Sequence, residues 1–139
     1  MSDLLDSSVL IAALIPDEPG HAESLALLKR GDCAIYLHAL HETFSTLTGG
    51  RMAIRVDAGV AARMLRESIS PQVTVVALTT DEVLDAIDTA RRHGVRGGAI
   101  YDYMHLVAAR KANAATLHTL NLDDFLHLRR SGDPEIRCP

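Results

Sequence analysis

The sequence has 139 residues, the size of one domain, and 47% of them are hydrophobic, which is enough to build a packed core. A formal net charge of −4 argues against a protein that coats DNA or RNA with a basic surface, but not against an enzyme that binds phosphate through metal ions. The apolar run 9–15 is too short to span a membrane. The two cysteines, Cys33 and Cys138, form no CxxC motif, so we expect a reduced, cytoplasmic compartment.

The first half of the chain alternates short apolar runs with helical spacing. Residues 4–5 form a predicted strand that ends at Asp6, and the serines that follow, Ser7 and Ser8, are typical helix caps. Polar or glycine-rich stretches separate the next elements. The predicted elements are a helix at 8–14, a helix at 21–29, a strand at 33–37 and a helix at 39–47.

The second half continues the alternation, beginning with helical spacing at 57–68. The β-branched run VTVVAL at 73–78 has few polar breaks, which is typical of a strand covered on both faces. The clearest helix is capped by Thr80, has acidic residues in its first turn and ends with basic residues before Gly94. The remaining predicted elements are a helix at 99–114, a strand at 115–120, a helical turn at 123–128 and an edge strand at 135–138.

Short strands that alternate with helices favour an α/β fold around a mostly parallel, twisted sheet of four to five strands. The sequence contains no internal repeat, no low-complexity segment and no long linker. We therefore predict a single domain over residues 1–139.

Acidic residues follow several of the predicted strands. Asp6 ends the first strand, Glu42 comes shortly after the second, Asp102 lies in the first turn of its helix, and Asp123 and Asp124 follow the strand at 115–120. In parallel sheets the ligand crevice lies beyond the carboxyl ends of the strands, so we expect these side chains at one edge. Clustered carboxylates repel one another unless a cation joins them, and oxygen ligands suit Mg²⁺ or Mn²⁺ better than zinc.

Four motifs, in this order and at these spacings, resemble the PIN domain family. They are LLDSSVL, HETFSTL, AIYDYMHLVAA and TLNLDDF. The resemblance covers essentially the whole chain, and in size and motif style it extends to the VapC-type toxins of bacterial toxin–antitoxin pairs. It implies a three-layer α/β/α sandwich.

By this resemblance Asp6, Glu42 and Asp102 match three acidic motif positions. The fourth role is carried over to Asp124, which precedes a phenylalanine as in the family's DF ending. One of Asp123 and Asp124 is only helix-start charge, and the sequence leaves open which. Many relatives have an aspartate where this chain has Asn121, which we expect to be a hydrogen-bonding partner at the site.

We predict a Mg²⁺- or Mn²⁺-dependent endoribonuclease. Asp6 and Asp102 would be the principal metal ligands, and Glu42 and Asp124 would act through water or at a second ion. Water activated by the metal would attack phosphorus and leave a 5′-phosphate and a 3′-hydroxyl. The residues expected to hydrogen-bond the metal-bound carboxylates or water are Ser8 and Thr119.

The VapC resemblance also implies partners. These are a second copy of the chain in a homodimer and a cognate VapB-like antitoxin, whose C-terminal segment would reach into the acidic cleft with an arginine. The apolar helix face at 60–65 is a candidate dimer surface. Arg51, Arg55 and Arg63 are candidates for contacts to RNA phosphates or to a partner's acids, and an ordinary solvated basic face is the alternative.

The main alternative is a catalytically inactive PIN-like module that only binds a partner. The retention of three acids and a fourth candidate favours an enzyme. A haloacid-dehalogenase-like phosphatase would need a second aspartate where Ser8 stands, and a receiver domain would need a lysine after the strand at 115–120. A zinc site at His38 and His41 would need a third ligand on the same face.

Overall fold

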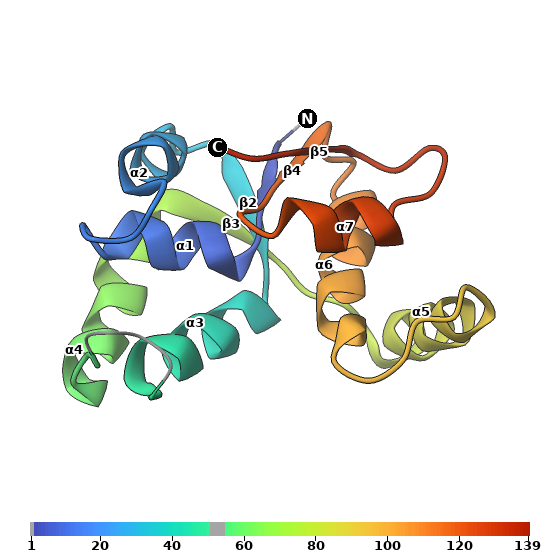
Figure 1. Ribbon diagram of the computed structural model, residues 1–139, viewed down its shortest axis with the longest axis horizontal. Coiled ribbons are helices and arrows are strands. Elements are labelled where there is room, and N and C mark those ends of the chain that lie inside the picture. The colour runs from blue at the N-terminus through green and yellow to red at the C-terminus, as the bar shows by residue number, and fades with distance from the viewer. Residues whose placement is uncertain (1, 51–54) are drawn as a thin grey trace.

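Parallel strands form the centre of the molecule (Figure 1). The computed structural model describes residues 2–50 and 55–139, so Arg51 lies outside the described residues. Within them one five-stranded sheet has the order β3-β2-β1-β4-β5, and every neighbouring pair is parallel. The strands are β1 (Leu4–Leu5), β2 (Cys33–Tyr36), β3 (Val73–Val76), β4 (Thr116–His118) and β5 (Glu135–Arg137). The strand that ends at Asp6 is therefore the central one.

Helices connect the strands. The helix at 21–29 has its predicted bounds, whereas the others are somewhat shorter or longer than the sequence pattern indicates. They are α1 (Ser7–Leu14), α2 (His21–Lys29), α3 (His38–Thr48), α4 (Ala58–Arg63), α5 (Thr80–Arg92), α6 (Ala99–Lys111) and α7 (Leu122–Leu128), with a π-helix (Met64–Ile69) and a 3₁₀ turn (Ser70–Gln72) after α4. No helix within the described ranges is both long enough and apolar enough to cross a membrane.

Two hydrophobic cores lie on opposite faces of the sheet. Leu4 and its register partners Ala34 and Leu117 pack with α5, α6 and α7 on one face. The next residues along the strands, Leu5 and Ile35, pack with α1, α2 and α3 on the other face. Figure 1 shows the two groups of helices on either side of the strands. This alternation of side chains confirms the predicted three-layer α/β/α sandwich.

The start of α1 differs from its prediction. Ser7 and Ser8 lie inside the helix, and the N-cap is Asp6, whose carboxylate accepts a hydrogen bond from the Val9 N–H at 3.2 Å. The prediction of serine caps was therefore wrong. Aspartate is as good a cap as serine, so the residue that ends β1 also begins α1 without an intervening loop.

Two other elements also depart from expectation. The N-cap of α5 is Thr79, not Thr80, and Thr79 forms a capping box with Glu82. The strand predicted to be covered on both faces is β3, which lies at one edge of the sheet and leaves Val75 38% exposed. A β-branched run predicts a strand but does not reveal its place in the sheet.

Candidate active site

Asp6 lies at the carboxyl end of the central strand and is only 2% exposed. Its Oδ1 accepts hydrogen bonds from the Ser8 hydroxyl at 2.5 Å and the Val9 N–H at 3.2 Å, and its Oδ2 accepts one from the Thr119 hydroxyl at 2.6 Å. Burial raises the pKa of Asp6, whereas the charge of His105 and these hydrogen bonds oppose the rise. The carboxylate is thus buried in a fixed orientation.

The two hydroxyls that hold Asp6 also hold the segment that leads into α7. The Leu120 N–H donates to Ser8 Oγ at 2.9 Å, and the Asn121 N–H donates to Thr119 Oγ1 at 2.9 Å. Each hydroxyl therefore donates to Asp6 and accepts from a backbone N–H at the start of the segment before α7, so residues more than 100 positions apart along the chain are joined. This network fixes the first acidic motif against the last one.

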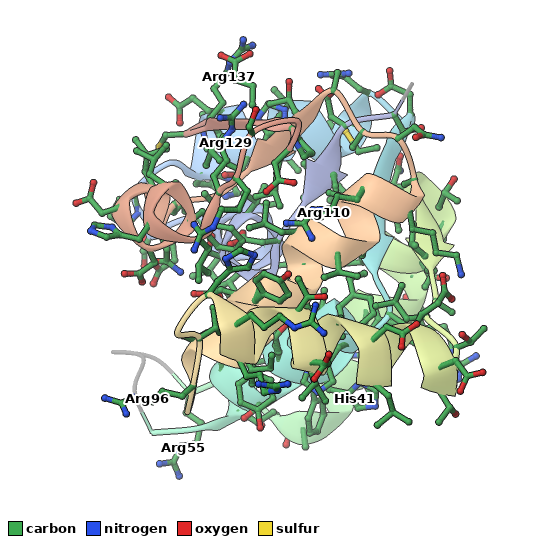
Figure 2. All side chains as sticks on the ribbon, turned by 90° about the vertical axis from the view of Figure 1, so that its right-hand side faces the viewer. His41, Arg55, Arg96, Arg110, Arg129 and Arg137 are labelled. Atoms are coloured by element: carbon green, nitrogen blue, oxygen red, sulfur yellow. The ribbon has the colours of Figure 1, made fainter. Side chains whose placement is uncertain are left out.

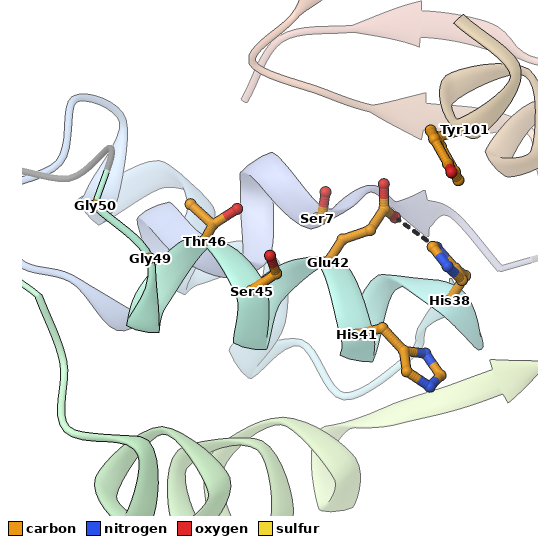
Figure 3. Close-up of a pocket in the computed structure, with 9 residues that line it drawn as sticks. All are labelled: Ser7, His38, His41, Glu42, Ser45, Thr46, Gly49, Gly50 and Tyr101. Atoms are coloured by element: carbon orange, nitrogen blue, oxygen red, sulfur yellow. Dashed lines mark ion pairs between the residues drawn. The ribbon is translucent and has the colours of Figure 1, made fainter. Parts of the chain in front are cut away.

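Glu42 comes from α3 and meets a histidine that the motifs did not place beside it. His105 Nε2 and Glu42 Oε1 are 2.6 Å apart, and His38 Nδ1 lies 3.7 Å from the same oxygen (Figure 3). Burial alone would raise the pKa of Glu42, but the hydrogen bond and charge of His105, aided by His38, lower it overall. Glu42 is therefore held as a carboxylate.

His105 is almost fully buried, at 1% exposure, in α6. Burial by itself lowers the pKa of a histidine, but the hydrogen bond to Glu42 and the charges of Glu42, Asp6 and Asp102 together raise it. Its other ring nitrogen, Nδ1, has no hydrogen-bond partner within the described part of the chain. His105 thus lies among three of the predicted site carboxylates, close enough for their charges to act on it.

Asp102 lies in the first turn of α6 and shares a hollow of about 580 Å³ with Asp124. Burial, together with the charges of Asp6, Asp124 and Glu42 and opposed by His105, raises the pKa of Asp102 to about 6. The four predicted acids therefore lie close enough to repel one another. They come from β1, α3, α6 and α7 and gather at one edge of the sheet.

The fourth motif is more open than the other three. Asp123, Asp124 and Asn121 are all exposed, and Asp124 is the one that lines the hollow with Asp102. Asn121 is the N-cap residue of α7, but its side chain makes no hydrogen bond to Asp124 or to the helix in the described ranges. Only its backbone N–H takes part in the site, through Thr119.

The four acids offer carboxylate oxygens, which are the ligands that a hard divalent cation prefers. Across residues 2–50 and 55–139 no lysine or arginine forms an ion pair with any of these acids. In the same residues no three acidic, histidine or cysteine side chains are already gathered as a metal site. The acids therefore fit Mg²⁺ or Mn²⁺, and their side chains would have to adjust to hold it.

The histidines that suggested a zinc site instead form a ring stack. His38 stacks on His41 with centroids 5.2 Å apart, and on Tyr101 with centroids 5.6 Å apart and planes at 11°. No zinc-like group of three ligands includes them in the part of the chain that the structure describes. These rings lie at the end of a groove, described below, that also contains Glu42.

The sequence matches the family model described as the PIN domain over residues 4–130. The chain belongs to the PIN domain family. It is also 30% identical over 110 residues to Ribonuclease VapC27 of Mycobacterium tuberculosis, a match that covers 79% of this chain and 78% of that protein. The predicted membership of the VapC-type PIN proteins is thereby confirmed.

Solved structures with the same PIN fold cover nearly the whole chain. Mycobacterium tuberculosis VapC20, described as a toxin that cleaves the Sarcin-Ricin loop, superposes with a TM-score of 0.71 at 23% identity and covers 98% of this chain and 99% of its own. VapBC2 from Rickettsia felis, solved with a DNA fragment from its promoter, gives a TM-score of 0.69 at 16% identity and covers 100% and 99%. At these identities the likeness establishes the fold.

Proposed function

We propose that this PIN domain is a Mg²⁺- or Mn²⁺-dependent endoribonuclease toxin of the VapC type. The observation that carries the proposal is the convergence of Asp6, Glu42, Asp102 and Asp124 at one sheet edge, where no lysine or arginine of the described residues neutralises them. The ribonuclease named among its relatives supports RNA as the substrate.

Each acid has a distinct task in this proposal. Asp6 and Asp102 would hold the ion, and Glu42 and Asp124 would hold water or a second ion. When bound, the ion supplies positive charge to the phosphodiester and makes water acidic enough to attack it. Hydrolysis by water leaves a 5′-phosphate and a 3′-hydroxyl.

The other residues keep the acids in place. Ser8 and Thr119 fix both oxygens of Asp6, and His105 fixes one oxygen of Glu42. Because a site of this kind works only when its ligands are preorganised, these neighbours matter nearly as much as the ligands themselves.

Incubation of the purified chain with total RNA and Mn²⁺ or Mg²⁺, followed by mapping of the new ends, tests the proposal. Cleavage should need the metal, leave 5′-phosphates and fall by orders of magnitude in Asp6→Asn, which keeps the shape and removes the charge. Asp124→Asn should also lower it, whereas Asp123→Asn is the matched control for helix-start charge. Metal-dependent cleavage that survives in Asp6→Asn contradicts the assignment and favours an inactive binding module.

We also infer a cognate VapB-like antitoxin, which is supported by the structural likeness to VapBC2. Beside α3 an apolar hollow of about 510 Å³ is lined by Leu40, Phe44 and Leu65, and Phe44 is 37% exposed. Exposed apolar hollows of this kind are typical partner surfaces. The chain purified from its own cells should carry the antitoxin with it, and cleavage of RNA should increase once the antitoxin is removed.

The homodimer remains a proposal, with the face at 60–65 as its candidate surface. In the structure Ala61 is buried, Val60 and Leu65 are half-buried and Ala62 is exposed, so only part of this face is open. Light scattering should give twice the 15.0 kDa of one chain, and Ala62→Glu should reduce that mass to one chain. A mass of 15.0 kDa for the unaltered protein contradicts the dimer.

A further inference from the structure

A polar groove of about 620 Å³ runs along α3, beside the acidic site (Figure 3). The aromatic rings of His38 and Tyr101 lie at one end with Glu42, and Gly49 and Gly50 lie at the other. The 11 residues of α3 between these ends span about 16 Å at the usual helical rise. The groove is therefore long enough for an extended segment of a polymer.

We propose that this groove binds a single-stranded segment of the RNA substrate, with one unstacked base lying on the ring of Tyr101. The inference rests on the proposed ribonuclease function and adds the residues that hold the strand, with Tyr101 against a base and Arg55 on a phosphate.

The Tyr101 ring forms the outer end of a stack of three rings. It lies parallel to His38, which in turn stacks on His41, and the Tyr101 side remains open because the residue is 54% exposed. An aromatic ring that is packed on one face and exposed on the other loses little conformational freedom when a base stacks on its exposed face. Stacking on such a ring tolerates any base, because every base has a π-face.

Hydroxyl groups line the middle of the groove. Ser7 comes from the first turn of α1, and Ser45 and Thr46 come from the side of α3 that also presents Glu42 (Figure 3). None of these three hydroxyls hydrogen-bonds to another protein group in the described part of the chain. They are free to bind the ribose hydroxyls and phosphate oxygens of a strand, which offer both donors and acceptors.

A guanidinium lies at the far end of the groove. Arg55 Nε donates to the Gly49 carbonyl at 3.4 Å, and a Cβ on Gly50 would lie 3.1 Å from Arg55 Nη2. The rest of the Arg55 side chain projects from the body of the molecule (Figure 2), and no carboxylate pairs with it among the described residues. A phosphate of the bound strand would supply that missing anion.

The depth of the acids argues for a single strand over a duplex. Asp6 is 2% exposed, so a phosphate can approach the acids only if the strand enters the hollow beside them. In a duplex the bases remain stacked within the helix and cannot reach Tyr101. A peptide offers such partners only where it places an acidic and an aromatic side chain at the right spacing, whereas every nucleotide carries both a phosphate and a base.

RNA binding should be measured in the full chain carrying Asp6→Asn, in EDTA, so that cleavage does not interfere. The probe is a 12-nucleotide RNA of mixed sequence with 2-aminopurine moved along it, and the same sequence as a duplex. We expect binding of the single strand, quenching of 2-aminopurine at one position and much weaker binding of the duplex. Tyr101→Ala should weaken binding about tenfold and abolish the quenching, and Tyr101→Phe should retain both.

Two matched controls separate the ring and the guanidinium from general surface effects. Leu84→Ala removes a side chain that is 57% exposed on α5 and should change nothing. Arg55→Ala should lower the salt dependence of binding by about 0.7 in the log–log slope, as for loss of one phosphate contact on a single strand. Arg137→Ala removes an exposed arginine of β5 outside the groove and should leave that slope unchanged.

The outcomes separate this inference from the function on which it rests. Equal RNA affinity in Tyr101→Ala and Arg55→Ala overturns the groove proposal even when the active chain cleaves RNA. If these variants instead lose affinity only for a purified antitoxin, the groove belongs to that protein partner and the RNA proposal is wrong. Failure of the active chain to cleave any RNA contradicts the proposed function, while the binding measurements still decide whether the groove holds RNA.

Discussion

Two groups of acidic residues lie at opposite ends of the central strands, and their surroundings differ. The amino-edge cluster consists of Asp3, Asp32, Arg30 and His118. The carboxyl-edge cluster consists of Asp6, Glu42, Asp102, Asp124 and His105. The first group is neutralised by its own chain: Arg30 pairs with Asp32 at 3.1 Å and with Asp3 at 3.4 Å, and His118 lies 3.0 Å from Asp3.

The pKa shifts of Asp32 and Asp102, one acid from each cluster, have opposite signs. At the amino edge, the hydrogen bond from Arg30 lowers the pKa of Asp32. At the carboxyl edge, burial and neighbouring carboxylates raise the pKa of Asp102 to about 6. An acid that has its own cation stabilises the fold, whereas an acid that repels its neighbours requires a ligand from outside. The second arrangement is typical of a functional site.

The largest difference between variants of the two clusters should appear in the rate of RNA cleavage. Asp102→Asn removes a proposed metal ligand and should lower the rate by more than about 100-fold, which exceeds the usual cost of losing a residue that only supports a ligand. Asp3→Asn removes an acid of the amino edge and should leave the rate within about twofold, since that cluster lies at the opposite end of the strands and its acids are paired within the chain. Comparable losses in the two variants contradict the distinction between the clusters.

Divalent cations should stabilise the fold by binding at the carboxyl-edge cluster and not at the amino-edge cluster. At 100 times its dissociation constant, Mn²⁺ or Mg²⁺ should raise the free energy of unfolding by about 2.7 kcal/mol, or the melting temperature by about 5–10 °C. Thermal unfolding should show this rise in the unaltered chain and in Asp3→Asn, and lose most of it in Asp102→Asn. The absence of any rise in the unaltered chain points to a vestigial site.

The positions of Asp6, Glu42 and Asp102 could be predicted because they depend on local sequence pattern and on a general rule of parallel sheets. Each acid comes soon after a strand or in the first turn of a helix, and β1, β2 and β4 are adjacent in the sheet. The strand order itself is not written in local pattern. For that reason β3 was expected to be covered on both faces, although it lies at an edge.

The contact between Glu42 and His105 could not be predicted, since 63 residues separate them along the chain. His105 is three residues after Asp102 and lies one helical turn further along α6, which is the only local signal of its role. The cap of α1 was missed for a different reason. Asp6 ends a strand and caps a helix at once, and the serines beside it satisfy the same cap pattern.

His105 should act as a positioning residue for Glu42. Its ring packs edge-on against Tyr36 and Phe125, and Nδ1 has no partner in the described residues. His105→Phe keeps an aromatic ring there but removes the hydrogen bond to Glu42 and the electrostatic interaction with the nearby carboxylates. We expect kcat to fall about tenfold with little change in KM. His105→Gln, which keeps an N–H donor, should recover part of the loss. Equal kcat values in the unaltered chain, His105→Phe and His105→Gln exclude this role.

The smallest effect should appear in the metal-free protein as a change of stability with pH. The pKa of Asp102 rises on folding from 3.8 to about 6, so its contribution favours the fold below pH 4 and is lost as the pH rises through 6. In EDTA at pH 7.5, Asp102→Asn should therefore be more stable than the unaltered chain by about 1 kcal/mol, after allowance for the partial exposure of the group. This gain should vanish toward pH 4.

Asp32→Asn provides the opposite sign in the same denaturation experiment. Because Arg30 lowers the pKa of Asp32, the stabilisation by this carboxylate is present at pH 7.5 and is lost as the pH falls through its pKa. The variant should therefore melt slightly below the unaltered chain at pH 7.5, whereas Asp102→Asn melts above it. If Asp102→Asn also melts below the unaltered chain at pH 7.5, the carboxyl edge carries no excess of negative charge, and the reason for assigning a cation to it disappears.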